Sequence, residues 1–275
     1  MAVIFDGKAF ADNKLIELKS RVGALKSKGI NLRMASIFLT SDSGSELYTK
    51  LKKKKAEEVG IEFIPYPIEE KDSRKFIDVI DELNMNTSIQ GILLQKPSGE
   101  NDFTHEEWGA MVMTLNPAKD VDGLTPENLG LVIIGTPRFI PATVKSVMDI
   151  LGYWKIDLVG KSAAIVGASE ILGKPLSLIL TEMDATVTLL HSKTPEISLY
   201  TKKADILISA AGKEGLITAD MVKKGSAIID VGAPKGDVRT DEVAGKVAFL
   251  SPVPGGAGPL TIANLIENLI NSIEE

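Results

Sequence analysis

A tyrosine and a lysine stand four positions apart near residue 50, a spacing that lets both side chains contact the same bound ring. Tyr48 and Lys52 fall in a stretch, residues 46–59, whose pattern predicts a helix. Residues four apart share one helix face, so the pair could stack on a ring and supply a proton or a positive charge. The same stretch also fits a solvated face, because Lys50 and the lysines at 52–55 are all charged.

Further polar candidates follow strand-like runs. Gln95 comes directly after a buried apolar run at 89–94, where an amide either faces a ligand or caps a loop. Asp120 and Asp122 stand in a polar loop at 116–128, and this loop shows no helical period. Paired carboxylates serve acid–base chemistry or hold a polar heterocycle, but Asp is also a common turn-capping residue. Both interpretations stay open for all three residues.

The stretch Ala163–Pro175, AAIVGASEILGKP, combines an apolar strand, a glycine turn and the start of an apolar helix. That arrangement presents free backbone N–H groups and the positive end of a helix dipole to a phosphate. Gly167 would permit the tight turn, and Gly173 would let helix and strand approach closely. Ser169 replaces the second glycine of the usual dinucleotide fingerprint, and the spacing is one residue longer. The stretch therefore predicts either a dinucleotide site or an ordinary strand–helix turn.

The next predicted strand, 186–190, bears on the choice of dinucleotide. An NAD site often carries an acidic residue about 20 positions after the fingerprint, where it binds the ribose hydroxyls. Here the strand is followed by His191, Ser192, Lys193 and Thr194, with no carboxylate among them. One cation and two hydroxyls tolerate a 2′-phosphate, so the sequence favours NADP over NAD.

Composition excludes several classes of protein and site. The 275 residues have 44% hydrophobic and 25% charged side chains, an ordinary globular composition. A net charge of -6 argues against a broad nucleic-acid-binding face. With no cysteine and two histidines, thiolate and histidine-built metal sites and a cysteine nucleophile are not expected. Because neither a signal peptide nor a membrane-spanning run is evident, we expect a soluble, cytoplasmic protein.

Strands alternate with helices along the whole chain, which predicts parallel sheets with crossover helices and an α/β fold. A first series of strands is expected at 34–39, 61–66 and 89–94. A short helix at 143–151 is interpreted as a bridge, and a second series opens with the glycine turn. The glycine–proline segment at 252–261 is expected to be a loop before a last apolar helix.

In combination, these motifs resemble the bifunctional methylenetetrahydrofolate dehydrogenase/methenyltetrahydrofolate cyclohydrolase family. Any one motif is a weak signal, but all of them in this order are highly specific, and they span most of the chain. The segments that carry the resemblance are Ser45–Lys52 (S-x-x-Y-x-x-x-K), Gly91–Pro97 (GILLQKP), Lys119–Gly123 (KDVDG), Gly167–Pro175 (G-x-S-x-x-x-G-x-P) and Pro252–Thr261 (PVPGGAGPLT).

The resemblance implies a role for each matching residue. Lys52 would be the central catalytic lysine, with Gln95 beside it and the ring of Tyr48 packed on the folate. Asp122 would bind the pterin edge, and Gly256 and Pro259 of the glycine–proline loop would also contact the substrate. The implied NADP contacts are Gly167, Ala168, Ser169, Gly173, Ser192 and Lys193.

The resemblance also implies the architecture and the partners. Residues 1–142, completed by the last helix at 261–275, would form an α/β folate-binding catalytic domain. Residues 143–260 would form a Rossmann-like NADP-binding domain, with the active-site cleft between the two. The expected partners are tetrahydrofolate derivatives and a second copy of the chain in a homodimer, with neither nucleic acid nor membrane. The implied setting is one-carbon metabolism and purine biosynthesis.

The chain departs from the family pattern in three places. After the third strand the family often reads Q-L-P-L-P, where this chain has Lys96 and then Pro97-Ser98-Gly99. Before the bridge helix, P-C-T-P is replaced by a segment with Ala142 and Val144, and Pro234 stands in the usual I-D-V-G-I-N motif. These departures leave the lysine, glutamine and aspartate intact, but they bear on affinities and on the balance of the two activities.

Two other functions compete with this interpretation. A different two-domain NADP dehydrogenase, of the shikimate dehydrogenase kind, shares the expected architecture but is not expected to carry KDVDG or PVPGGAGP. A non-catalytic folate- or dinucleotide-binding protein would have no need of Lys52, Gln95 and Asp122 together.

The segment after residue 190 generates the first testable prediction. Because Ser192 and Lys193 stand where an NAD site often has a carboxylate, kcat/KM should be higher with NADP than with NAD. The measurement is dehydrogenase kinetics with each dinucleotide at saturating folate. Equal or better use of NAD would refute the prediction.

Overall fold

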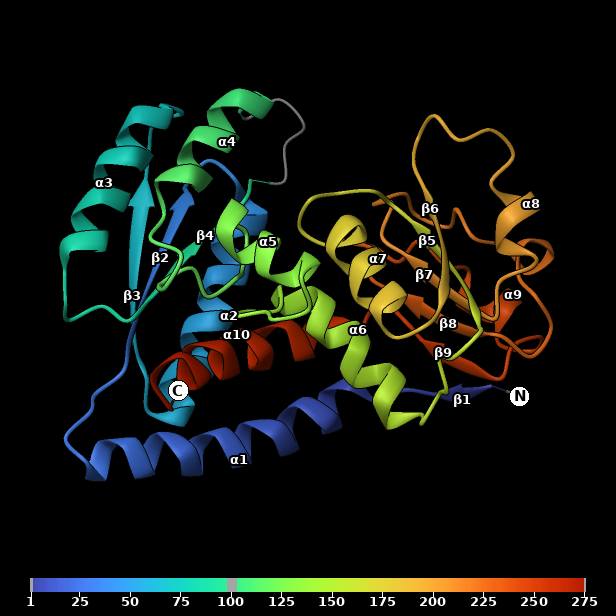
Figure 1. Cartoon of the computed structure of the whole chain (residues 1–275), viewed down its shortest axis with the longest axis horizontal. Helices are drawn as coiled ribbons and strands as arrows, with labels where there is room; N and C mark the ends of the chain where they lie inside the picture. Colours follow the sequence, from blue (N-terminus) through green and yellow to red (C-terminus); the bar gives the residue numbers. More distant parts are fainter. Residues whose placement is uncertain (1, 98–102, 275) are drawn as a thin grey trace. The chain divides into compact units, whose positions relative to one another are not determined.

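The computed structural model describes residues 2–97 and 103–274, and it divides into two compact units (Figure 1). We call them the three-stranded unit and the six-stranded unit after their sheets. The three-stranded unit comprises Asn13–Leu131, Pro137–Ala142 and Leu265–Glu275; the six-stranded unit comprises Met1–Asp12, Val132–Thr136 and Thr143–Asn264.

The three-stranded unit is built on a parallel sheet in the order β3-β2-β4. The strands are β2 (Arg33–Leu39), β3 (Glu62–Ile68) and β4 (Gly91–Leu94). Each neighbour of β2 runs parallel to it, with Met34 opposite both Phe63 and Gly91. Because the strands are parallel, their carboxyl ends lie at one edge of the sheet, where ligands of α/β proteins bind.

Helices connect these strands, and local capping explains where several of them begin and end. Asp42 caps α2 by accepting from the Gly44 N–H at 3.2 Å, and Gly60, with φ of 98°, ends it. Thr104 and Glu107 form a capping box that starts α4. The helices that lie wholly or partly in this unit are α1 (Gly7–Ser27), α2 (Ser43–Val59), α3 (Ser73–Met85), α4 (His105–Thr114), α5 (Pro126–Ile133) and α10 (Ala257–Glu274).

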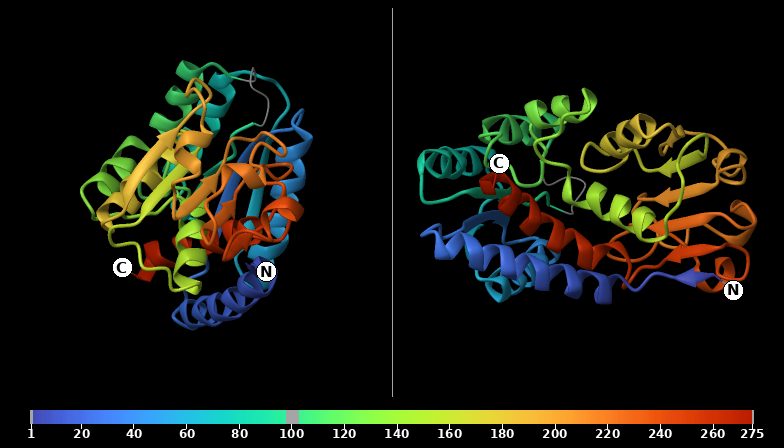
Figure 2. Two further views of the ribbon diagram at one scale, coloured as in Figure 1. Left: turned by 90° about the vertical axis from the view of Figure 1, so that its right-hand side faces the viewer. Right: turned by 60° about the horizontal axis from the view of Figure 1, so that its bottom comes forward.

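The six-stranded unit has a second parallel sheet in the order β1-β9-β8-β7-β5-β6, seen from two further directions in Figure 2. Its strands are β1 (Val3–Ile4), β5 (Ser162–Val166), β6 (Thr186–Leu190), β7 (Ile206–Ser209), β8 (Ala227–Asp230) and β9 (Phe249–Ser251). Its other elements are α6 (Ala142–Tyr153), α7 (Gly173–Glu182), α8 (Ser198–Thr201), α9 (Thr240–Val243) and a 3-10 helix, η1 (Ala219–Met221).

The strand order identifies where this second sheet should bind a ligand. From β5 the chain first builds β6 on one side, and then returns to build β7, β8 and β9 on the other side. The order therefore reverses between β5 and β7, and the crevice at such a reversal, outside the carboxyl ends of the strands, is the usual ligand site.

The first residues of the chain pack with the six-stranded unit, although the sequence placed them in the first domain. β1 pairs with β9, and the Phe5 N–H donates to the Leu250 carbonyl at 2.9 Å. The Phe5 ring also packs edge-on against Tyr153 and Trp154, at 5.3 and 5.9 Å between centroids. The expected functional boundaries at 142/143 and 260/261 stay a prediction, because packing does not say what each part binds.

The two-domain α/β class with parallel sheets is confirmed, and β6 has the expected bounds. Two expected loops are too long, however: α5 begins at Pro126, inside 116–128, and α10 begins at Ala257, inside 252–261. Proline is common in the first turn of a helix, because the N–H that it lacks would have no partner within the helix. Pro126 is therefore compatible with the start of α5 and was not evidence for a loop. β1 and β9 are too short for a sequence period to reveal them.

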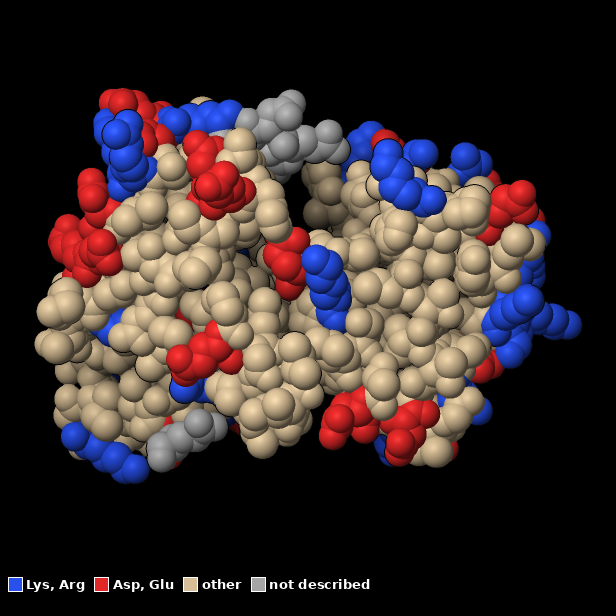
Figure 3. Space-filling view, turned by 45° about the horizontal axis from the view of Figure 1, so that its top comes forward, with Lys and Arg blue, Asp and Glu red and all other residues tan. Residues whose placement is uncertain are grey.

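Charged side chains on the surface bear on the expected partners. In Figure 3 Lys and Arg are scattered among Asp and Glu on the visible face, and no broad basic area stands out there. This agrees with the net charge of -6. No helix within residues 2–97 and 103–274 is both long and apolar enough to cross a membrane.

Candidate active site

Lys52 is buried, with 6% of its surface exposed. It lies on α2 one turn after Tyr48, and its Nζ sits 4.9 Å from the centroid of the Tyr48 ring. The same Nζ donates to Oε1 of Gln95 at 2.6 Å. The expected helix face is therefore present, and Lys52 points inward instead of joining the solvated lysines.

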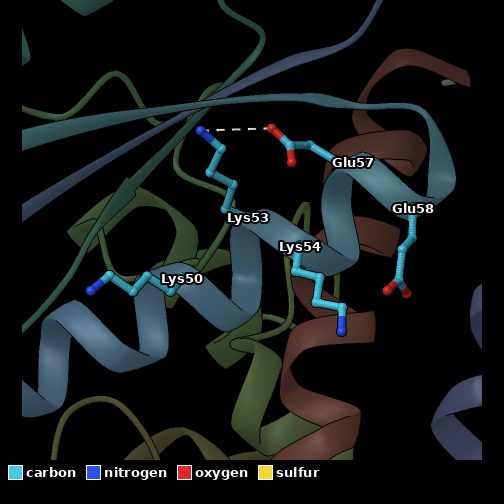
Figure 4. A pocket seen from close by; sticks show the side chains of 5 residues that line it. All are labelled: Lys50, Lys53, Lys54, Glu57 and Glu58. Carbon is cyan, nitrogen blue, oxygen red and sulfur yellow. Dashed lines mark ion pairs between the residues drawn. The ribbon is translucent and has the colours of Figure 1, made fainter.

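Those other lysines lie on the outer side of the same helix. Figure 4 shows Lys50, Lys53 and Lys54 with Glu57 and Glu58 lining a shallow hollow on α2. Lys50 pairs with Glu46 at 2.7 Å, and Lys53 pairs with Glu57 at 3.7 Å. The interpretation as a solvated face therefore holds for these lysines, whereas Lys52 is buried, and its action on a bound ring stays a prediction.

Gln95 reaches Lys52 because of where β4 ends. The Gln95 N–H donates to the Ile37 carbonyl at 2.9 Å, which continues the pairing of β4 with β2 beyond Leu94. The backbone is thereby fixed at the carboxyl edge of the sheet, and the side chain turns to Lys52. The Gln95 side chain thus contacts the buried lysine, and its contact with a ligand stays a prediction.

The KDVDG segment gives each charged residue a different contact. Lys119 donates to the carbonyls of Leu83, Asn84 and Asn86 at 2.8–2.9 Å, which satisfies the end of α3. Asp120 is 1% exposed and accepts from the Thr125 N–H at 2.7 Å and from Asn128 at 3.0 Å. The turn-capping interpretation therefore holds for Asp120.

Asp122 is placed differently. Its Oδ1 accepts from the Ala142 N–H at 3.3 Å, and its charge acts on both Lys52 and Tyr48. Asp122 therefore completes a group with Lys52, Gln95 and Tyr48, all within the three-stranded unit. The structure brings together all four residues that the sequence named as catalytic.

Burial sets the protonation of this group. Loss of water lowers the pKa of Lys52 to about 8, although the nearby Asp122 charge works in the opposite direction. Burial likewise raises the pKa of the Asp122 carboxyl, and the Lys52 charge opposes that shift. Burial, assisted by Asp122, also raises the pKa of Tyr48, which keeps the phenol protonated. A fraction of Lys52 is thus a neutral amine near neutral pH, which suits proton transfer.

Asn268 is a positioning residue that the sequence did not reveal. Its Nδ2 donates to the Val121 carbonyl at 2.8 Å and to the Ile140 carbonyl at 2.9 Å, so it holds the loop that carries Asp122. It is 3% exposed on α10, among buried apolar residues. A polar amide on an otherwise apolar helix face was the one feature of the sequence that could have indicated this role. The sequence does not show which groups Asn268 contacts, because they lie more than a hundred residues away.

Beyond β5, two glycines shape a turn that no larger residue would allow. Gly167 has φ of 123°, and a Cβ there would stand 2.2 Å from the Ala210 carbonyl oxygen. A Cβ on Gly173 would stand 1.8 Å from the Gly167 carbonyl oxygen, so this glycine permits α7 to approach the strand. Ala168 and Ser169 lie partly exposed between them. The predicted glycine turn is therefore present.

Ser192 and Lys193 lie exposed in a turn directly after β6. The Lys193 N–H donates to Nδ1 of His191 at 3.1 Å, and the His191 N–H donates to Thr194 at 3.0 Å. Since Leu190 is opposite Val166, this turn and the glycine turn share one edge of the sheet. A dinucleotide on the glycine turn would extend toward it.

Gly256 and Pro259 belong to the six-stranded unit, whereas the Lys52 group belongs to the three-stranded unit. A Cβ on Gly256 would stand 2.2 Å from Oγ of Ser251 and 2.4 Å from the Pro252 carbonyl oxygen, so the loop is folded tightly on itself. Pro259 lies in the first turn of α10. Their contact with folate stays a prediction.

The structure shows where most of the residues that depart from the family pattern lie. The Lys96 ammonium lies 5.2 Å from the Trp108 ring, Val144 is fully buried, and the Ala142 N–H contacts Asp122. Pro234 lines a surface hollow beyond β8. Ser98 and Gly99 lie outside the described residues. Among the described residues, no group of three His, Cys, Asp or Glu could hold a metal ion.

Comparisons with known proteins cover nearly the whole chain. The catalytic-domain model of tetrahydrofolate dehydrogenase/cyclohydrolase matches residues 5–122, and the NAD(P)-binding-domain model of the same enzyme matches residues 141–275. A curated relative from Thermodesulfovibrio yellowstonii, named bifunctional protein FolD, is 43% identical over 277 residues, 98% of this chain and 96% of the relative.

Solved structures agree. The bifunctional methylenetetrahydrofolate dehydrogenase/cyclohydrolase FolD from Campylobacter jejuni matches with a TM-score of 0.92 and 38% identity, over 100% of this chain and 99% of that one. The Trypanosoma brucei enzyme, complexed with NADP and an inhibitor, matches with a TM-score of 0.91 and 31% identity, over 99% and 97%.

The competing family is much less similar. Shikimate 5-dehydrogenase from Thermus thermophilus matches with a TM-score of 0.52 and 15% identity over 88% of this chain and 99% of that one, which is a likeness of fold alone. The full-length similarity, both domain models and the assembled Lys52 group agree, and the chain belongs to the tetrahydrofolate dehydrogenase/cyclohydrolase family.

Proposed function

We propose that this chain oxidises methylenetetrahydrofolate to methenyltetrahydrofolate with NADP and then hydrolyses the product to formyltetrahydrofolate, with Lys52 as the proton-transfer group of the second step. The observation that carries the proposal is the buried Lys52 amine, held 2.6 Å from Gln95 and 4.9 Å from the Tyr48 ring. A spectrophotometric assay with methylenetetrahydrofolate and NADP tests it. A chain that forms no NADPH and does not hydrolyse the methenyl compound would overturn it.

NADP fits the residues beyond β5 and β6. Added side-chain atoms at Gly167 and Gly173 would stand 2.2 and 1.8 Å from backbone oxygens of this chain, so only glycines permit this tight turn, and a glycine turn between a strand and a helix suits a dinucleotide phosphate. Lys193 and Ser192 supply a cation and a hydroxyl for a 2′-phosphate. NADP would supply the acceptor for a hydride. We assign it to the six-stranded unit and folate to the three-stranded unit.

For the oxidation, the residues of this chain have to position the folate and need not move a proton. The hydrogen leaves with both electrons of the breaking C–H bond, as a hydride, so no protein base is required. The Tyr48 ring offers a surface for stacking, and the Asp122 carboxyl offers oxygen atoms to polar N–H groups of the pterin edge. Holding the donor carbon at attack distance is the main contribution of the protein.

The hydrolysis differs because water must lose a proton as it adds to the methenyl carbon. One carbon–nitrogen bond of the bridge then breaks, and the nitrogen that leaves takes up a proton. Neutral Lys52 has a lone pair that can accept that proton, directly or through water. Gln95 Oε1 accepts one N–H of the amine, which orients Nζ. Asp122 stabilises the ammonium that then forms, since its charge favours protonated Lys52. Lys52, Gln95 and Asp122 thus form one proton-handling group.

The homodimer, the cytoplasmic location, the role in purine biosynthesis, and the domain boundaries at 142/143 and 260/261 stay predictions from the sequence.

Replacement of Lys52 should separate the two activities. Lys52→Met keeps an unbranched apolar stem and removes the amine. General acid–base catalysis contributes typically about 10²–10⁴-fold, so cyclohydrolase kcat should fall at least about tenfold more than dehydrogenase kcat. The matched control is Lys54→Met, because Lys54 is exposed on the outer side of the same helix (Figure 4), and it should change neither activity. Equal loss of both activities in Lys52→Met would instead make Lys52 a residue that positions folate.

The lowered pKa of Lys52 predicts a pH dependence confined to the hydrolysis. With a pKa of about 8, the neutral fraction rises from about one tenth at pH 7 to about nine tenths at pH 9. Cyclohydrolase kcat, corrected for the uncatalysed rate, should therefore rise through about pH 8, while dehydrogenase kcat should not. The rise should vanish in Lys52→Met. The same rise in both activities, or its persistence in the variant, would contradict the assignment.

Asp122 gives a test of the folate assignment. In Asp122→Ala, polar folate atoms lose a charged partner, at a cost of about 1.5–3 kcal/mol, so folate affinity should fall roughly tenfold to a hundredfold. NADP affinity should not change, and the rise of cyclohydrolase with pH should move to lower pH, because Asp122 no longer favours protonated Lys52. Both affinities are measured by titration.

The control for this variant is Asp81→Ala, an exposed aspartate on α3. It should alter neither affinity. If folate binding in Asp122→Ala is unchanged while NADP binding falls, then Asp122 has been placed in the wrong half of the site.

A further inference from the structure

Two carboxylates are fully buried in the six-stranded unit, and neither has a part in the mechanism above. Asp230 ends β8, and Asp237 follows seven residues later; both are 0% exposed. Burial of a carboxylate is unfavourable unless its oxygens are hydrogen-bonded. Apolar residues would fill the same space with less loss of stability, so the contacts of these two groups are informative.

Asp237 holds the loop that leaves β7. Its Oδ2 accepts from the Ser209 hydroxyl at 2.9 Å and from the Ala211 N–H at 2.6 Å, and its Oδ1 accepts from the Lys213 N–H at 2.8 Å. All three donors belong to the end of β7 and the residues directly after it. The carboxylate therefore fixes the backbone of the segment 210–213, which we call the β7 loop.

Asp230 holds Asp237 in turn. It accepts from the backbone N–H groups of Asp237 at 3.1 Å, Val238 at 2.9 Å and Gly232 at 2.9 Å. A Cβ on Gly232 would stand 2.6 Å from Oδ1 of Asp237, and a Cβ on Gly236 would stand 2.6 Å from Oδ2 of Asp230. The two glycines are thus required for the close approach of the carboxylates to the backbone.

The β7 loop lies directly across from the glycine turn. The Ala210 N–H donates to the Val166 carbonyl at 2.7 Å, and the Ala210 carbonyl oxygen is the atom that a Cβ on Gly167 would meet at 2.2 Å. The strand order reverses between β5 and β7. The glycine turn and the β7 loop are therefore the two walls of the crevice in which a sheet of this kind binds its ligand.

We propose that Asp237 is a positioning residue for NADP, because its carboxylate holds the β7 loop as the wall opposite Gly167. Without it, two backbone N–H groups and a hydroxyl lose their acceptor, and the loop is free to leave the conformation that faces the glycine turn. Asp230 supports the same wall through Asp237. The proposal rests on the assignment of NADP to this edge of the sheet.

The test uses the fact that hydrolysis of the methenyl compound consumes no NADP. In Asp237→Asn, one acceptor oxygen becomes a donor that faces an N–H group. The dissociation constant for NADPH, from fluorescence titration, and KM for NADP should rise about tenfold or more. Cyclohydrolase kcat should stay within about twofold of wild type. A merely structural role would lower both activities together.

Asp205→Asn is the matched control, because Asp205 precedes the same strand at its opposite end. It accepts from the Ser162 N–H at 3.0 Å and pairs with Lys223, at the amino edge of the sheet. This variant should leave NADPH affinity unchanged. An Asp237→Asn protein with wild-type NADPH affinity, or an equal loss of affinity in Asp205→Asn, would overturn the proposal.

Ser209→Ala decides the matter if Asp237→Asn does not fold. It removes one donor to Asp237 and leaves the carboxylate in place, so KM for NADP should rise about threefold or more with cyclohydrolase kcat unchanged. An unchanged KM would overturn the proposal. Failure of the wild-type chain to bind NADPH at all would instead contradict the proposed function, so the two failures are distinguishable.

Discussion

The removal of Lys52 from water is the constraint on which the candidate site depends. A solvated lysine is protonated near neutral pH and has no lone pair to offer. Burial lowers the pKa of Lys52 to about 8, but the buried amine then needs a polar partner. Gln95 provides the acceptor at 2.6 Å, and Asp122 keeps the pKa from falling further. The balance between burial and these two neighbours gives an amine that can both accept and hold a proton.

That balance requires the loop carrying Asp122 to be fixed, and most residues near the site serve this purpose. Lys119 attaches the loop to the end of α3, Asp120 closes its turn, and Asn268 holds the carbonyl of Val121. None of them contacts Lys52 in the hydrogen bonds described. A change in Asn268 would therefore alter the chemistry by moving Asp122, which makes α10 part of the support for the site.

The six-stranded unit solves its own positioning problem with glycines and buried carboxylates. Gly167 and Gly173 let one stretch of backbone approach another closely. The β7 loop, on the other side, is held by a side chain: the N–H groups of Ala211 and Lys213 donate to the Asp237 carboxylate. The conformation of the glycine turn thus depends on residues without side chains. The conformation of the β7 loop depends on the Asp237 carboxylate, which accepts hydrogen bonds from its backbone N–H groups. Both devices leave backbone groups in one fixed arrangement.

The sequence predicted those parts of the site that depend on local spacing. A helical period places Tyr48 and Lys52 on one face, and the end of an apolar strand places Gln95 at the binding edge. Spacing alone could not distinguish Asp120 from Asp122, and only the family resemblance selected Asp122. The two aspartates differ in what folds against them, because Asn128 donates to Asp120 and Lys52 lies near Asp122. Asn268 and Asp237 were missed for the same reason. Their partners are mainly backbone groups that lie far away in the sequence and come close only in the folded chain. Residues that do chemistry can therefore be predicted from the sequence more readily than residues that hold them in place.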